Sequence, residues 1–183
     1  SVRDGLMILH ELGAISNEEK HDAPVLTAIG RDIARIPVDP KMARMLVEAN
    51  RLGVLDDVTV IVANMTIQDV RERPLEFQAQ ADQAHARFKD KQSDFLSALK
   101  LWDYINDSRD ELTGNAFRKR MKREFLHYMR IREWYDLVRQ LRDVERGLGW
   151  SRAENVANKR DADAIHKSLL TGLLSCLLYT SPS

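Results

Sequence analysis

The sequence predicts a mainly α-helical protein in which a degenerate winged helix with a small β-hairpin is followed by a helical bundle. The 183 residues include only 8 Gly and 5 Pro beside 44% hydrophobic residues, a composition that suits a soluble helical protein. Apolar residues recur at helical spacing along most of the chain, and only one short segment favours strands. A chain of this length can bury a sizeable core as one large domain or two small ones.

The N-terminal part of the chain carries the strand signal. Residues 4–12 resemble the end of a helix that Gly13 terminates. The apolar pairs at residues 14–15 and 25–26 flank a polar segment, residues 16–24, and this arrangement predicts a short hairpin or wing.

Three capped helices follow the predicted hairpin. Thr27 is expected to cap a brief helix that Pro37 ends. Asp39 followed by Pro40 predicts the start of the next helix, and Gly53 its end. A third helix should begin near Asp56 and Asp57, and its apolar run at residues 58–62 should be buried.

From Pro74 onward the sequence has the pattern of long amphipathic helices. Ser93 is expected to cap one of them, and Asn115 to cap another. A further helix should run through Val144, and the last should span residues 161–174.

These patterns divide the chain into a winged-helix-like unit at residues 1–72, a helical bundle at residues 73–175 and a tail at residues 176–183. The apolar pattern begins immediately after Ser1, which predicts that the first unit is truncated at its N-terminus. The tail abandons the charged, periodic pattern of the bundle, so we interpret it as an artefact and exclude it from the fold.

Candidate catalytic and metal-binding patterns are missing from the sequence. There is no phosphate-binding G-x-x-x-x-G-K-[ST] loop, the five histidines are widely spaced, and Cys176 is the only cysteine. We therefore expect a chain without catalytic residues, bound metal or cofactor. The longest apolar run, residues 169–179, is far short of the roughly 20 residues needed to span a bilayer. These features predict a cytoplasmic protein with no membrane partner.

The strongest physical signal is a local excess of positive charge, although Lys and Arg balance Asp and Glu at 28 each over the whole chain. On a helix through residues 116–128, Phe117 and Met121, with Phe125 and Tyr128, should form the core face. Arg120 has an acid at i+4, Glu124. Four other cations have no such partner and are candidates for RNA phosphate contacts, although a merely solvated face explains them equally well: Arg118, Lys119, Lys122 and Arg123.

Secondary candidates lie on the next helix. Arg132, Arg139 and Arg146 share one helical face, with Asp136 and Asp143 three or four residues away. This spacing favours intrahelical ion pairs and a solvated face over nucleic-acid contact.

Two further secondary candidates are Arg71 and Arg73, which could position a neighbouring domain or a phosphate. The aromatic residues Trp102, Trp134 and Tyr135 occur at core spacing and are expected to pack rather than to stack on bases.

Six segments in matching order carry a family resemblance, among them TIQDVRERP at residues 66–74. They lie at residues 11–15, 26–49, 66–74, 84–104, 123–142 and 165–175. These segments resemble the C-terminal helicase-associated region of bacterial HrpA-type DEAH-box RNA helicases. One departure is Val70, where the family typically has Pro; the resemblance ends at Cys176.

The resemblance implies a degenerate winged helix and a ratchet-like helical bundle that pack against two RecA-like motor domains of the same polypeptide. Single-stranded RNA would pass between motor and bundle, and ATP and Mg²⁺ would be bound upstream, in the parent helicase. The implied function is an accessory, RNA-guiding module that forms part of the RNA channel.

Two alternatives remain open. One is a free-standing winged-helix regulator that binds nucleic acid, although the helix after Pro40 carries only Lys41, Arg44 and Arg51. The other is a purely structural scaffold between domains, which needs no RNA contact.

Overall fold

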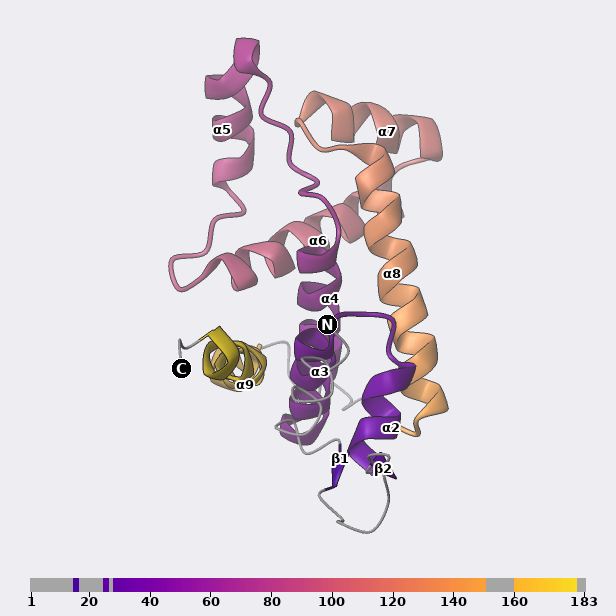
Figure 1. The fold of residues 1–183 in the computed structure, drawn as a ribbon. Helices are drawn as coiled ribbons and strands as arrows, with labels where there is room; N and C mark the ends of the chain where they lie inside the picture. Colours follow the sequence, from indigo (N-terminus) through magenta and orange to yellow (C-terminus); the bar gives the residue numbers. More distant parts are fainter. Residues whose placement is uncertain (1–14, 17–24, 27, 151–159, 181–183) are drawn as a thin grey trace. The chain divides into compact units, whose positions relative to one another are not determined.

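The computed structural model describes residues 15–16, 25–26, 28–150 and 160–180, and it is mainly α-helical, as the sequence predicts (Figure 1). The chain divides into two compact units, one of Ser1–Thr59 with Leu141–Ser183 and one of Val60–Gln140. We call them unit 1 and unit 2. The boundary between residues 72 and 73 that the sequence suggests stays a prediction.

Unit 1 contains two short strands. β1 (Ile15–Ser16) pairs antiparallel with β2 (Val25–Leu26), so that Ile15 lies opposite Leu26. The loop predicted between them, the helix predicted at residues 4–12 and the Thr27 cap lie outside the described residues. The hairpin as a whole and the winged-helix interpretation therefore stay predictions.

Helix α2 (Ala28–Arg35) precedes helix α3 (Pro40–Leu52), whose two ends confirm the capping signals. The Asp39 side chain accepts a hydrogen bond of 2.8 Å from the backbone N–H of Lys41, and Pro40 is the first helical residue. Gly53 ends the helix with φ of 77°, a left-handed conformation that glycine adopts without a steric penalty.

Helix α9 (Ala162–Thr180) packs against α3 within unit 1. The contact is close at Gly172, where an added Cβ would lie 2.5 Å from the Lys41 carbonyl oxygen and 2.6 Å from Met45 Cγ. α9 extends beyond the predicted end at residue 174.

None of the helices in the described part of the chain has an apolar stretch sufficient to cross a membrane.

Helix α4 (Leu55–Thr66) begins with Asp56 and Asp57 in its first turn, where negative charge favours the helix dipole. Its residues 58–62 are all buried, as predicted. The buried Thr59 hydroxyl donates a hydrogen bond of 2.9 Å to the Glu145 carboxylate, also within unit 1.

Unit 2 contains the rest of α4, a 3₁₀ turn η1 (Leu75–Phe77), helices α5 (Gln78–Ala86), α6 (Asp94–Glu111) and α7 (Gly114–Arg123), and most of α8 (Tyr128–Gly147). Ser93 caps α6 by accepting from the Leu96 N–H, as predicted. Trp134 on α8 is 0% exposed, and its Nε1–H donates to the Val60 carbonyl oxygen at 3.0 Å. Its ring packs against Trp102 with centroids 4.8 Å apart, which confirms a core role for both.

The start and end of α7 differ from the prediction. The helix begins at Gly114 with Thr113 at the cap position, so Asn115 is not its cap. It ends at Arg123, and Phe125 has φ of 57°. Phe117 and Met121 are buried as predicted, but the expected single helical face fails beyond them, because the chain turns at Phe125 and Tyr128 starts α8.

Candidate nucleic-acid interface

Helix α7 exposes a group of cations outside the face formed by its buried residues Phe117 and Met121. We call Arg118, Lys119, Lys122 and Arg123 the α7 basic face; all four are exposed. Within the described part of the chain, Lys119, Lys122 and Arg123 make no ion pair. The Arg118 guanidinium lies over the Tyr128 ring, with Cζ 4.6 Å from the centroid. The structure thus brings the four primary candidates together on one helix with their charge uncompensated locally.

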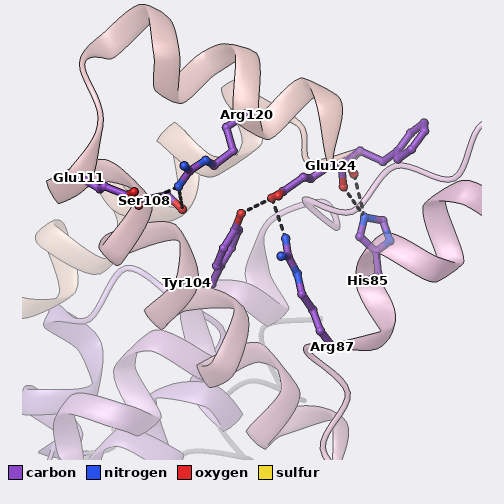
Figure 2. Close-up of polar contacts among 8 residues, drawn as sticks. His85, Arg87, Tyr104, Ser108, Glu111, Arg120 and Glu124 are labelled. Carbon is purple, nitrogen blue, oxygen red and sulfur yellow. Dashed lines mark hydrogen bonds and ion pairs between the residues drawn. The ribbon is translucent and has the colours of Figure 1, made fainter.

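The acid that follows α7, Glu124, is engaged elsewhere (Figure 2). Its Oε2 lies 2.8 Å from Arg87 Nη2 and also accepts a hydrogen bond from the Tyr104 hydroxyl. Arg87 in turn stacks over the Tyr104 and Phe88 rings at 4.2 and 4.6 Å. Burial raises the pKa of Tyr104, and the hydrogen bond to Glu124 raises it further. Glu124 is therefore held within a cluster formed with α5–α6 residues.

The predicted pairing of Arg120 with Glu124 is wrong. Arg120 Nη1 instead lies 2.9 Å from Glu111 Oε2 and 3.5 Å from Ser108 Oγ, both on α6 (Figure 2). The physical reason is that Glu124 follows the end of α7 and is bound by Arg87. The hydrogen bond with Glu111 raises the pKa of Arg120.

The turn between α7 and α8 is fixed by contacts to distant segments. His85 Nε2 lies 3.0 Å from the carbonyl oxygens of both Glu124 and Phe125 (Figure 2). Carbonyl oxygens only accept, so this nitrogen carries the hydrogen. The Phe125 carbonyl also accepts from the Glu72 N–H at 2.8 Å, and Arg71 and Leu126 form an antiparallel bridge. These bonds hold Phe125 in a left-handed conformation that is unusual for a bulky residue.

Arg71 and Arg73 line a groove of unit 2 with a volume of about 800 Å³, together with His85, Lys89 and Phe95. Each arginine is neutralised by an aspartate that the sequence reasoning missed. The bonds from Arg71 to Asp69 measure 3.1 and 2.9 Å, and those from Arg73 to Asp82 measure 2.7 and 2.8 Å.

The arginine partners lower the pKa of both groove aspartates, Asp69 and Asp82. The Arg73 guanidinium holds the pKa of Asp82 below its ordinary value. Burial acts to raise the pKa of Asp69, but its hydrogen bonds from Arg71 outweigh burial and lower it. Among the described residues, no three His, Cys, Asp or Glu side chains gather in a way that could hold a metal ion.

The α8 arginines follow the prediction in two cases of three. Arg139 pairs with Asp136 at 3.1 Å, and Arg146 pairs with Asp143. Arg132 is exposed and has no ion pair among the described residues, because Asp136 bonds to Arg139 instead. The expectation of an intrahelical pair is therefore wrong for Arg132.

Comparison with known proteins gives consistent matches. Residues 39–98 match the family described as helicase associated domain (HA2), ratchet-like. The chain is 43% identical over 175 residues to the ATP-dependent RNA helicase HrpA of Escherichia coli (strain K12), and the aligned region covers 96% of this chain. It is 41% identical over 176 residues, 95% of this chain, to the ATP-dependent RNA helicase HrpA homolog of Haemophilus influenzae.

A more distant match is 30% identical over 97 residues, 53% of this chain and 8% of the relative. It is the pre-mRNA-splicing factor ATP-dependent RNA helicase prp22 of Schizosaccharomyces pombe. The chain spans 13% of the length of each of the two bacterial relatives.

Proposed function

Because the chain corresponds along most of its length to the helicase-associated, ratchet-like region of HrpA-type DEAH-box RNA helicases, we propose that it guides RNA for such a helicase. In this role it forms part of the channel for single-stranded RNA, beside RecA-like motor domains of the same polypeptide. The ATP and Mg²⁺ that drive the parent enzyme bind outside this chain, whose sequence has no phosphate-binding loop.

The α7 basic face is the observation that carries this proposal. Four exposed cations lie within six residues, while the acids that flank them in the sequence, Glu111 and Glu124, are bound by Arg120 and Arg87. Such a surface attracts the phosphates of a nucleic acid. The contacts would position the strand without reading its sequence, which suits a guiding role.

The fixed turn after α7 supports the same role. A guiding surface must keep its cations in place while an RNA strand moves past them, because a mobile helix would shift together with the strand. The His85 and Glu124 contacts fix the C-terminal end of α7 against α5 and α6. The groove arginines are weaker candidates, since a phosphate would have to displace Asp69 and Asp82.

The alternative of a free-standing regulator draws less support from α3, the helix after Pro40. Arg44 and Arg51 both pair with Glu48, whose side chain is only 11% exposed. Two of the three cations on that helix thus share one carboxylate, which offsets one of their two positive charges.

Two matched double substitutions test the proposal: Lys119→Gln with Lys122→Gln, and Arg139→Gln with Arg146→Gln. Each removes two exposed cations, but only the first pair lacks carboxylate partners. The readout is the affinity for an unstructured RNA oligonucleotide, measured by fluorescence anisotropy at several salt concentrations.

The first double variant should flatten the slope of log affinity against log salt by about 1.4, roughly 0.7 for each lost phosphate contact with a single strand. The α8 variant should leave the slope unchanged, although its uncovered aspartates lower affinity somewhat. Equal slopes for both variants and for the unaltered chain would refute the proposal and favour the structural scaffold.

A further inference from the structure

Arg118 differs from the other cations of the α7 basic face because it rests on an aromatic ring. Its guanidinium carbon lies 4.6 Å from the Tyr128 centroid, and Phe117 packs against the same ring in a T-shaped arrangement with centroids 6.2 Å apart. Phe117 is buried, so the aromatic support belongs to the core of unit 2. Arg118 itself stays exposed, which leaves guanidinium surface available to a ligand.

Unit 2 contains two comparable stacks that differ in their electrostatic surroundings. Arg87 over Tyr104 is neutralised by Glu124. Arg109 lies 4.2 Å over Tyr135, but it stands between Asp107 and Asp110 in the sequence of α6. Arg118 instead lies among exposed cations that make no ion pair with the described residues, so its stack offers a nucleic acid more net positive charge than that of Arg109.

We propose that Arg118 is a base-stacking residue, on whose guanidinium plane a base of single-stranded RNA rests while Lys119 and Lys122 contact neighbouring phosphates. This inference rests on the proposed function. A guanidinium is planar and weakly hydrated, and it stacks on π-systems as well as bearing charge. Unpaired bases of RNA stack on arginine planes and aromatic rings. Lys122, four residues after Arg118, lies on the same side of the helix and can reach the adjoining backbone.

A stacking site at Arg118 selects its ligand more narrowly than positive charge alone would. A base within a duplex is already stacked on both faces, so the Arg118 site takes single strands in preference to duplexes. Every base presents a π-face, so the site tolerates any sequence. A strand without bases would keep the phosphate contacts and lose the stack.

The test uses the full 183-residue chain and the substitution R118K, which keeps the charge and removes the plane. Its matched control is R109K, which makes the same change in the stack on Tyr135. Each variant is titrated with an RNA oligonucleotide and with the same oligonucleotide carrying abasic sites. Circular dichroism checks that the helices are intact, which is expected because Arg118 is exposed.

R118K should bind the base-containing strand about fivefold more weakly, the low end of the range for loss of one stacked base. Its salt slope should stay unchanged, and its preference for the base-containing over the abasic strand should shrink by the same factor. R109K should match the unaltered chain in all three measurements. If Arg118 served packing alone, R118K would weaken the binding of both strands equally and leave the preference for the base-containing strand intact.

If R118K keeps the preference while the Lys119 and Lys122 double variant flattens the salt slope, the stacking proposal is overturned and the proposed function stands. If the double variant leaves the slope unaltered, the proposed function fails and the stacking proposal fails with it.

Discussion

Replacement of Glu124 by Gln should destabilise unit 2, because the Glu124 carboxylate joins α7 to the segment between α5 and α6. The substitution keeps the size of the side chain and its capacity to accept the Tyr104 hydroxyl. It removes the charge that holds Arg87 at 2.8 Å.

The expected magnitude follows from burial and charge. A hydrogen bond to a charged group contributes about 1.5–3 kcal/mol. The Glu124 side chain is 21% exposed and that of Arg87 is 47% exposed, so solvent screens part of this contribution. We expect a loss of about 1–2 kcal/mol in the free energy of unfolding.

Glu111→Gln provides the matched control. Glu111 also accepts from an arginine, at 2.9 Å from Arg120, but its side chain is 65% exposed. The same chemical change should therefore lower the free energy of unfolding much less, because solvent screens the exposed pair.

Urea unfolding followed by tryptophan fluorescence measures the difference. A background in which Trp150 is replaced by Phe leaves Trp102 and Trp134, both in unit 2, as the reporters. With a slope of about 2 kcal/mol per molar urea, E124Q should lower the midpoint by roughly 0.5–1 M. Equal shifts of the urea midpoint for E124Q and E111Q would refute the reasoning that burial makes the Glu124–Arg87 interaction more stabilising than the Glu111–Arg120 interaction.

Three further predictions concern the other parts of the chain. Gly172→Ala should destabilise unit 1 by about 1–2 kcal/mol, since overpacking outweighs the gain in helix propensity, whereas Gly114→Ala, with open space around it, should not; thermal unfolding compares them. The hydrogen bond from Arg51, with the charges of Arg51 and Arg44, lowers the pKa of Glu48 below 4.5 despite burial. The ionised carboxylate therefore stabilises the folded chain at pH values above 4.5, and this stabilisation is lost as the pH falls through the lowered pKa. Urea midpoints from pH 6 to 2.5 should therefore fall less steeply for Glu48→Gln, and an identical pH dependence would contradict the assignment. The purified chain should show no ATP turnover in a coupled phosphate-release assay, and turnover that survives further purification would contradict its non-catalytic role.

Much of the helical structure could be predicted because its signals are local. Asp39, Pro40 and Gly53 define both ends of α3 through bonds within a few residues. The α8 pairs Arg139–Asp136 and Arg146–Asp143 follow from helical spacing alone. A sequence displays such short-range relations directly.

The electrostatic environment of α7 could not be predicted in the same way. Spacing assigned Glu124 to Arg120, but the structure pairs Glu124 with Arg87, 37 residues away, and Arg120 with Glu111 on α6. The left-handed turn at Phe125 carries no Gly or Asn that would reveal it, because tertiary hydrogen bonds from His85 and Glu72 impose it.

Crosslinking in the intact parent helicase tests the central claim most directly. The helicase would be loaded on single-stranded RNA that contains photoreactive uridines, irradiated, digested and analysed by mass spectrometry. We expect crosslinked peptides from residues 114–128, and fewer of them when Arg118, Lys119, Lys122 and Arg123 are all replaced by Gln. Efficient crosslinking of the RNA to the motor domains with none to residues 114–128 would contradict the central claim and leave the chain a structural scaffold.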